Sequence, residues 1–380
     1  MRIVLVTESF LPDVNGVAHS VVRTAEHLVR RGHEPLVIAP QPKSGVRPPV
    51  PDLPYPVVRI PSVPMPGYRQ FRLGLPTPAL SVAIRAHRPD VVHLASPFML
   101  GAWGQAAARA SAVPSVAVYQ TDVAAYARAY RLGMTEGAAG RWIRSIHNAA
   151  ARTLAPSTEA AAALTAHGVQ RIHLWRRGVD DVRFHPRHRS AGIRRALAPD
   201  GEVLVGFVGR LAVEKQIELL AGVSRLPRVR LVIVGDGPAG SWLRRALPAA
   251  VFLGARHGAQ LARVYASLDV FAHTGPYETF GQAVQEAMAS GLPVVAPAAG
   301  GPLDLVRHGR TGYLVPPHRA DGFTDAVERL AGDPRLRTGF GAAGRTAIEG
   351  RSWTAVGDEL IGHYGDVLRT GVPANLVAAA

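Results

Sequence analysis

The sequence predicts an α/β protein built from two doubly wound domains that face each other across a cleft. At 380 residues, the chain is longer than one hydrophobic core usually supports, so two domains of ordinary size are expected. Short apolar runs, in which polar residues do not alternate with apolar ones, are followed in succession by helical patterns. This order indicates parallel sheets covered by helices on both faces. The alternation stops at residues 177–186, where turn and charged residues show no period, and then begins again. We therefore expect domains at residues 1–176 and 177–352.

The first domain opens with a buried strand at residues 3–6 and a helix that starts near Gly16 and ends at Gly32. Its further strands are predicted at residues 36–39, 57–60, 91–94, 116–119 and 153–155. Its further helices are predicted at residues 79–88, 102–110, 140–150 and 157–167. Strands of the second domain are predicted at residues 203–208, 231–234, 251–253, 270–273 and 293–296. In the last part, residues 353–380, an amphipathic segment is expected to cross back to the first domain, and the tail after Thr370 to fray.

Composition excludes several classes of protein. A hydrophobic content of 47% with 19% charged residues indicates a compact chain and not a disordered one. The chain has no cysteine, which excludes disulfides, thiol nucleophiles and thiolate-bound metals. The apolar start is interrupted at Glu8, too early for a signal peptide, and no apolar run is long enough to span a bilayer. We therefore expect a cytoplasmic protein.

The formal net charge of +15 favours anionic partners such as phosphates, nucleic acid or an anionic lipid leaflet. The basic residues are scattered and nearly all of them are arginine. Neither a basic strand interleaved with aromatic residues nor a zinc-finger spacing is present, so we do not expect nucleic acid as a partner.

Two glutamates flank the start of a helix predicted at residues 282–290, which Gly291 ends: Glu278 stands on the segment before it and Glu286 inside it. Eight residues of continuous helix would leave the side chains roughly 80° and about 12 Å apart, too far to share one small group. If Glu278 lies on the preceding loop, both carboxylates can face one elongated ligand, such as a sugar joined to a nucleoside through a diphosphate. Two ordinary surface glutamates remain the alternative.

Two cations, Arg210 and Lys215, follow the strand predicted at residues 203–208, where a helix is expected to begin. The planar guanidinium of Arg210 and the compact ammonium of Lys215 can converge on one diphosphate. There they can neutralise the negative charge of a departing nucleoside diphosphate. Two alternatives remain. Glu214 can cap the start of the helix, and the two cations can be part of a solvated basic helix end.

Gly16 begins the first predicted helix, where a phosphate can approach free backbone N–H groups and the positive end of the helix dipole. Asn15 can equally be a plain N-cap. The chain contains neither G-x-G-x-x-G nor G-x-x-x-x-G-K-[ST], which argues against a dinucleotide fold and a P-loop nucleotidase.

Three further segments of interest follow predicted strands. Asp122 can bind a sugar hydroxyl or stabilise charge at an anomeric carbon, or it can cap a helix. Arg256, after Gly254-Ala255, can line a base pocket or lie on the surface. Gly300-Gly301-Pro302 is expected to open a helix beside the site. The fifteen histidines show no H-E-x-x-H spacing, and no metal site is predicted.

Taken together, these segments resemble the retaining glycosyltransferases of family four, which have the GT-B fold of two Rossmann-like domains. The resemblance rests on the Glu278 and Glu286 run, on Gly209-Arg210 with Lys215, and on Gly178-Val179-Asp180 followed by Phe184 and Pro186. More narrowly, Thr7-Glu8-Ser9-Phe10-Leu11-Pro12 and Val118-Tyr119-Gln120-Thr121-Asp122-Val123 look like actinobacterial GDP-mannose-dependent α-mannosyltransferases. Members of that group act on glycolipid acceptors such as glucuronosyl diacylglycerol or phosphatidylinositol mannosides.

The resemblance implies a role for each site residue. Arg210 and Lys215 would hold the donor diphosphate, assisted by the Gly16 backbone, while Glu286 accepts hydrogen bonds from the ribose and Glu278 lies at the transferred sugar. The backbone N–H groups of Thr279, Phe280 and Gly281 would contact sugar and phosphate. Many relatives carry a His-Asp or His-Glu pair where this chain has Thr121-Asp122, so Asp122 inherits the catalytic role without a neighbouring imidazole.

The implied reaction transfers a hexosyl residue, most simply α-mannosyl from GDP-mannose, to a glycolipid or polyol with retention of configuration. The resemblance implies no metal and no cofactor beyond the nucleotide-sugar donor, because cationic side chains stabilise the leaving diphosphate. A basic and aromatic region of the first half suits peripheral contact with an anionic membrane, and a soluble, arginine-rich surface is the alternative; the region comprises Tyr68, Arg69, Phe71, Arg72, Leu73, Arg85 and Arg88.

Other functions fit the same architecture. A UDP-sugar transferase acting on a small cyclitol would share most of these residues, and a nucleotide-sugar epimerase would use a sugar nucleotide without an acceptor. A phosphorylase needs a lysine for pyridoxal phosphate, and this chain has few lysines. A non-catalytic anion-binding module would show no donor turnover.

Overall fold

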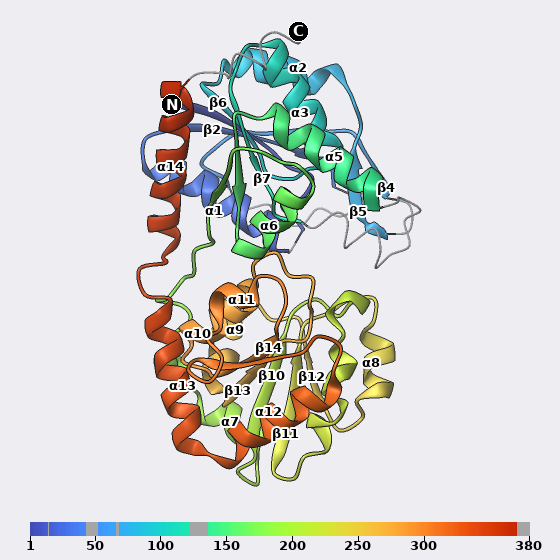
Figure 1. Cartoon of the computed structure of the whole chain (residues 1–380), viewed down its shortest axis with the longest axis vertical. Helices are drawn as coiled ribbons and strands as arrows, with labels where there is room; N and C mark the ends of the chain where they lie inside the picture. Colours follow the sequence, from blue (N-terminus) through green and yellow to red (C-terminus); the bar gives the residue numbers. More distant parts are fainter. Residues whose placement is uncertain (14, 43–51, 66–67, 122–135, 371–380) are drawn as a thin grey trace. The chain divides into compact units, whose positions relative to one another are not determined.

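The computed structural model describes residues 1–13, 15–42, 52–65, 68–121 and 136–370, and these form two units. Unit 1 comprises Met1–Arg177 and Trp353–Ala380, and unit 2 comprises Gly178–Ser352. Each unit is a parallel sheet flanked by helices (Figure 1). Within the described residues, no helix combines the length and the apolar composition that a membrane crossing requires.

The sheet of unit 1 has seven strands in the order β3-β2-β1-β6-β7-β8-β9, and all its pairs are parallel. Its strands are β1 (Arg2–Val6), β2 (Glu34–Pro40), β3 (Val57–Ile60), β6 (Val91–Leu94), β7 (Ser115–Val118), β8 (Arg152–Ala155) and β9 (Ile172–Leu174). A separate antiparallel hairpin consists of β4 (Ser62–Met65) and β5 (Tyr68–Gly74). The helices are α1 (Gly16–Arg30), α2 (Pro78–His87), α3 (Met99–Ala110), α5 (Glu136–Ala149), α6 (Thr158–Ala166) and α14 (Trp353–Thr370).

Alternate residues of each central strand enter different cores, because the side chains of a strand alternate between the two faces of its sheet. In β1, Ile3 and Leu5 join one apolar cluster while Val4 and Val6 join another. The apolar face of α14 belongs to the first of these clusters, through Val356, Leu360, Tyr364 and Val367. Figure 1 shows α14 alongside α1, with which it packs.

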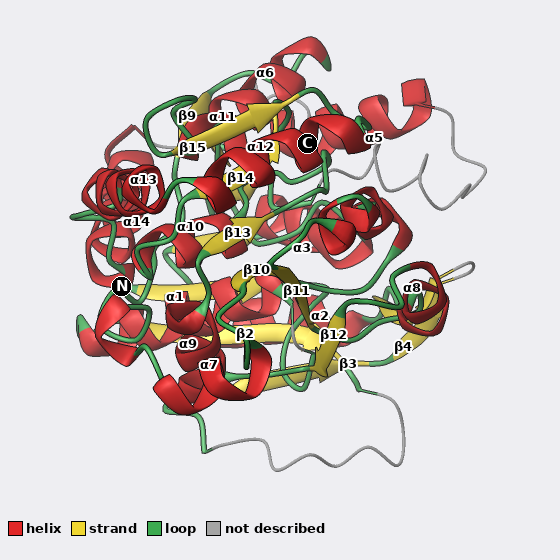
Figure 2. Cartoon of the chain, turned by 90° about the horizontal axis from the view of Figure 1, so that it is seen from below, coloured by secondary structure: helices red, strands yellow, loops and turns green. Residues whose placement is uncertain are grey.

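Unit 2 repeats this construction with six parallel strands in the order β12-β11-β10-β13-β14-β15, several of which can be followed in Figure 2. The strands are β10 (Val203–Val208), β11 (Val229–Val234), β12 (Val251–Gly254), β13 (Val270–Ala272), β14 (Val294–Pro297) and β15 (Gly312–Val315). The α-helices are α7 (Ala191–Leu197), α8 (Gly240–Ala246), α9 (Gly258–Ser267), α10 (Gln282–Ala289), α11 (Pro302–Leu305), α12 (Ala320–Gly332) and α13 (Pro334–Ala347). Short 3₁₀ turns are η1 (Pro186–His188), η2 (Val213–Lys215), η3 (Ile217–Ala221) and η4 (Val223–Arg225).

The predicted α/β class and its parallel sheets are confirmed, and every predicted strand has a counterpart. The strands that the sequence did not reveal are β9, β15 and the β4–β5 hairpin. Strands β9 and β15 lie at the edges of the two main sheets and have only three or four residues with partly exposed side chains. They therefore lack a long buried apolar run. The chain after β10 was predicted to form a helix; it forms three short 3₁₀ turns instead.

Candidate functional site

The strand order of unit 2 reverses direction between β10 and β13, which lie side by side in the sheet. The chain leaves β10 toward one side of the sheet and β13 toward the other, which makes this position the topological switch point of the sheet. Ligands of open α/β sheets bind at such a switch point. The two segments here are residues 209–215 and residues 273–281.

Lys215 and Glu278 meet at this switch point, since the Lys215 ammonium forms an ion pair with Glu278 Oε1. Both side chains are mostly buried but still reachable from solvent, at 18% and 22% exposure. The hydroxyl of Thr274 donates to the Lys215 carbonyl over 2.5 Å, which ties the two segments together. Lys215 therefore ends a 3₁₀ turn beside Glu278 and does not stand on the helix end that the sequence predicted.

Arg210 is held by Glu214, one turn further along the same segment. Glu214 is buried at 5% exposure, so its carboxylate supports the guanidinium from the protein interior and does not cap a helix start. Both predicted diphosphate cations thus have a carboxylate partner here. An anionic ligand would replace or share these partners.

Sequence reasoning missed the loop that supports Arg210. The segment Gly235-Asp236-Gly237 follows β11, and the Leu211 N–H donates to the Asp236 carbonyl over 2.9 Å. A Cβ at Gly235 would lie 1.9 Å from the Gly209 carbonyl oxygen, so only glycine permits this approach. Two glycines flanking a polar residue directly after a buried strand are the signal that could have revealed the loop.

Glu278 lies on the loop before α10, as one of the two sequence interpretations required. The predicted helix is confirmed as α10, with Gly281 at φ 95° before it and Gly291 at φ 74° after it. Gly301 N–H donates to the Glu278 carbonyl over 2.7 Å, and a Cβ at Gly300 would lie 2.5 Å from that same oxygen. The Gly300-Gly301 turn, which precedes α11 as predicted, therefore fixes the backbone of Glu278.

Glu286 lies on α10 with other partners. Burial raises its pKa to about 7, against hydrogen bonds from the Tyr265 hydroxyl and the Gln282 amide that lower it. The charge of Arg183 also lowers the pKa of Glu286, and the charge of Asp180 raises it. Glu286 itself is partly exposed to solvent. Glu278 and Glu286 thus have separate environments, which suits two contacts on one elongated ligand.

The other predicted donor residues of unit 2 surround these groups in sequence. Phe280 is buried and Gly281 forms the N-cap of α10, while Thr279 is partly exposed between Glu278 and Phe280. Arg256 follows β12, and its guanidinium donates to the Ala255 carbonyl over 2.9 Å. The structure gives Arg256 no contact with Arg210, Lys215 or Glu278 among the described residues.

Gly16 belongs to unit 1, where it begins α1. The side chain of Asn15 caps this helix, accepting hydrogen bonds from the N–H groups of Val17 and Ala18 over 3.0 Å each, as the plainer interpretation predicted. Arg177, which the sequence did not suggest, donates to the Gly16 carbonyl over 2.7 Å and to Gln120 over 2.5 Å. Asp122 lies outside the described residues.

Glu8 occupies the corresponding switch point of unit 1, between β1 and β6. Leu100 N–H, at the start of α3, donates to its Oε1 over 2.7 Å, and the Glu8 N–H donates to Ser96 over 3.0 Å. Burial raises the pKa of Glu8 to about 8 in spite of these backbone donors. This carboxyl group joins the segments that follow β1 and β6, and so fixes the chain that leads to Gly16.

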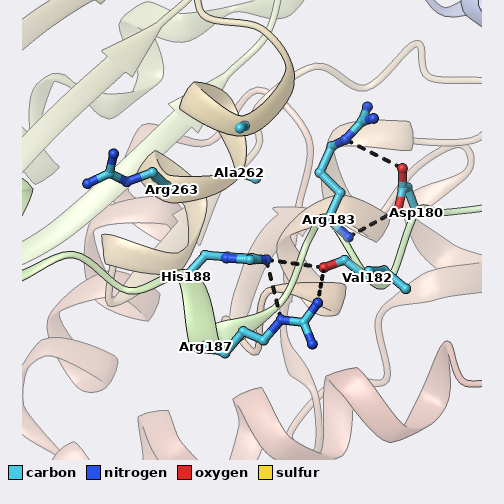
Figure 3. A pocket seen from close by; sticks show the side chains of 8 residues that line it. Asp180, Val182, Arg183, Arg187, His188, Ala262 and Arg263 are labelled. Atoms are coloured by element: carbon cyan, nitrogen blue, oxygen red, sulfur yellow. Dashed lines mark hydrogen bonds and ion pairs between the residues drawn. The ribbon is translucent and has the colours of Figure 1, made fainter.

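A pocket of about 420 Å³ lies in unit 2 beside α9 (Figure 3). Its lining comprises Asp180, Val182, Arg183, Arg187, His188, Ala259, Ala262 and Arg263, none of which is a predicted donor residue. The guanidinium groups of Arg183, Arg187 and Arg263 point in different directions in Figure 3 and do not converge on one centre. In the part of the chain that the structure describes, no three His, Asp or Glu side chains form a group suited to a metal ion.

The chain is similar to known proteins along nearly its whole length. The sequence model described as Glycosyltransferase Family 4 matches residues 14–183, and that described as Glycosyl transferases group 1 matches residues 202–333. A protein of Mycobacterium tuberculosis named GDP-mannose-dependent alpha-mannosyltransferase is 50% identical, with 96% of each chain covered. A protein of the same name from Corynebacterium glutamicum is 44% identical, covering 97% of this chain and 89% of that one.

Among solved structures, a sucrose-phosphate synthase from Thermosynechococcus elongatus matches with a TM-score of 0.81. The match covers 97% of this chain and 99% of that one at 21% sequence identity, and therefore concerns the fold.

Proposed function

The chain belongs to glycosyltransferase family 4 and has the two Rossmann-like domains of the GT-B fold, and we propose that it transfers an α-mannosyl residue from GDP-mannose with retention of configuration. The ion pair of Lys215 with Glu278 at the switch point of unit 2 carries this proposal. It joins a cation suited to a diphosphate with a carboxylate suited to sugar hydroxyls. The relatives named GDP-mannose-dependent alpha-mannosyltransferases support the donor.

In this proposal the donor lies at the switch point of unit 2. Lys215 and Arg210 bind the diphosphate, with the Gly16 backbone assisting, and the loop of Thr279, Phe280 and Gly281 contacts sugar and phosphate through its N–H groups. Glu278 binds the mannosyl hydroxyls and Glu286 the ribose hydroxyls, while the segment at Arg256 borders the base. The separate surroundings of the two glutamates support their assignment to different ends of the donor.

The proposed reaction breaks the bond between mannosyl C1 and the diphosphate oxygen, and its electron pair remains on the leaving diphosphate. C1 passes through an oxocarbenium-like state, and the acceptor hydroxyl attacks it from the same face. The hydroxyl proton moves to a phosphate oxygen, and Asp122 stabilises the charge near C1. Lys215 and Arg210 act where negative charge grows, which is where fixed cations accelerate the reaction most. We propose that these side chains do so without a metal ion.

A glycolipid is the proposed acceptor, reached by peripheral contact of unit 1 with an anionic membrane. The net charge of +15 supports this contact, as do the exposed Arg85 of α2 and the exposed Arg88 that follows this helix. Arg72 offers less support, because its guanidinium donates to the Gln41 and Ser62 carbonyls. The side chains of Tyr68 and Arg69 lie outside the described part. Co-sedimentation with liposomes should increase with anionic lipid content; binding that ignores lipid charge would remove the membrane contact.

A thermal-shift panel of GDP-, UDP- and ADP-sugars tests the donor. A ligand that binds the native state stabilises it by RT ln(1 + [L]/Kd), so the preferred donor should raise Tm most. We expect a selective shift with GDP-mannose. Selectivity for a UDP-sugar would favour a cyclitol transferase instead, and conversion of the donor without any acceptor would indicate an epimerase.

The affinity for GDP-mannose should rise with pH around neutrality. Glu286 has a pKa raised to about 7, so it is protonated below this pH and an ionised hydrogen-bond acceptor above it. Ribose hydroxyls donate more strongly to the ionised form, so we expect the donor Kd at pH 6 to be up to about tenfold above that at pH 8. The diphosphate of GDP-mannose is esterified at both ends and does not titrate in this range.

Isothermal titration calorimetry at both pH values measures this effect. Glu286→Gln is the matched variant, since its amide cannot ionise, and its donor Kd should be insensitive to pH. A wild-type Kd that is equal at pH 6 and pH 8 would contradict the role of Glu286 at the ribose.

A further inference from the structure

His273 is a buried histidine in contact with the candidate donor site. It follows β13 directly and is 2% exposed. Its ring stacks on Phe207 of β10, with ring centroids 6.2 Å apart and planes inclined by 5°. Its Nε2 lies 3.5 Å from Glu278 Oε1, the oxygen that also receives the Lys215 ammonium. The imidazole and the ammonium therefore share one carboxylate oxygen.

The hydrogen bonding of His273 is incomplete in this state. Neither ring nitrogen has a hydrogen-bond partner of normal geometry among the described residues, although the Gly275 backbone lies close enough to favour the protonated ring. Buried polar atoms without partners are rare and costly, so their presence beside a ligand site indicates a task outside folding. An apolar ring of the same shape would stack on Phe207 equally well.

The charge of His273 limits what it can do. Burial lowers its pKa to about 4; Glu278 opposes this shift and Lys215 adds to it. The ring is therefore neutral near pH 7 and cannot serve as a third cation for the diphosphate. It retains one N–H, which can donate a hydrogen bond to a carboxylate.

The local backbone is arranged for this approach. A Cβ at Gly275 would lie 3.2 Å from Lys215 Cδ and 3.4 Å from His273 Nε2, so glycine lets both side chains close on Glu278. When a donor diphosphate draws the ammonium of Lys215 away, Glu278 loses its cationic partner. The His273 ring, whose Nε2 lies 3.5 Å from Glu278 Oε1, can then offer an N–H donor to this carboxylate.

We propose that His273 is a positioning residue that holds the Glu278 carboxylate against the sugar once Lys215 has turned to the diphosphate. The inference rests on the proposed function, because it assigns the diphosphate to Lys215 and the sugar to Glu278. His273 itself touches neither the reacting carbon nor the leaving group. It acts by keeping one carboxylate oxygen in a single orientation, and a misplaced catalytic contact costs rate steeply.

Two variants of the full-length chain test the inference. His273→Phe keeps the stack on Phe207 and removes both ring nitrogens, whereas His273→Gln restores an N–H donor near the position of Nε2. In His273→Phe we expect kcat for GDP release from GDP-mannose, with glucuronosyl diacylglycerol in micelles as acceptor, to fall about 10- to 100-fold. We expect the Kd of GDP to stay within about twofold, because the diphosphate contacts are intact.

Further readouts separate positioning from a structural role. His273→Phe should lose the extra affinity of GDP-mannose over GDP, should keep or raise Tm because no good hydrogen bond is lost, and should be partly rescued in His273→Gln. His147→Phe removes an equally buried histidine of unit 1 and should leave kcat unchanged.

Four results would overturn the inference: normal kcat in His273→Phe, no rescue by glutamine, an equal loss of GDP and GDP-mannose affinity, or a lowered Tm that accounts for the lost activity. A wild-type chain that does not turn over GDP-mannose would instead remove the proposed function, and this inference with it.

Discussion

Replacement of Lys215 with alanine is expected to lower kcat at saturating donor by about 10²- to 10³-fold, the effect of removing one fixed group that stabilises charge in a transition state. Lys215 is the cation that faces Glu278 at the switch point, where it is 18% exposed and so poorly screened by water. Its ammonium would neutralise the negative charge that grows on the leaving diphosphate. Because this charge is larger in the transition state than in the bound donor, kcat should fall by a larger factor than the donor affinity.

The chain offers a close control for this variant, since its lysines are Lys43 and Lys215. Lys43→Ala removes the same charge from the protein and should leave kcat unchanged. Lys215→Arg keeps the positive charge but replaces the compact ammonium with a planar guanidinium. It should therefore retain a higher kcat than Lys215→Ala, though below that of the wild type. Steady-state kinetics with GDP-mannose measure all three variants. Near-normal turnover in Lys215→Ala would refute its assignment to the diphosphate.

Replacement of Glu278 with glutamine is expected to separate turnover from diphosphate binding. The variant keeps the size of the side chain and removes its charge, so the mannosyl hydroxyls lose an ionised acceptor. Hydrogen bonds to charged groups contribute about 1.5–3 kcal/mol each, so kcat should fall about 10- to 100-fold. The Lys215 ammonium, freed from its ion pair, should bind GDP as tightly as in the wild type or more tightly.

Kinetics with GDP-mannose and calorimetry with GDP measure these opposite effects. Glu328→Gln, on the exposed face of α12, makes the same chemical change away from the site and should alter neither quantity. If Glu278→Gln weakened GDP binding and left kcat intact, Glu278 would belong to the diphosphate end of the donor and not to the sugar.

Much of the fold followed from patterns that are local in the sequence. The buried strands of both sheets are short apolar runs without alternation, and such runs form the central strands of a parallel sheet. Helix α10 was equally visible, because Gly275-Pro276 ends the strand before it and Gly291 ends the helix, where the structure places Gly291 at positive φ. The edge strand β15 was not predicted, because its own residues show only a weak pattern. Its position in the sheet depends on its pairing with β14.

The sequence alone determined that this chain has two parallel α/β domains and that Arg210, Lys215, Glu278 and Glu286 are its candidate donor residues. The tertiary structure decided how these residues pair: Lys215 with Glu278, Arg210 with the buried Glu214, and Glu286 with Tyr265 and Gln282. It also decided that His273 joins the site and that the chain after β10 forms turns. The physical reason is that strand order brings together segments some sixty residues apart in the chain, as the contact of Lys215 with Glu278 spans 63 positions. Local residue patterns encode strands and helices, whereas such a meeting depends on which strands become neighbours in the sheet.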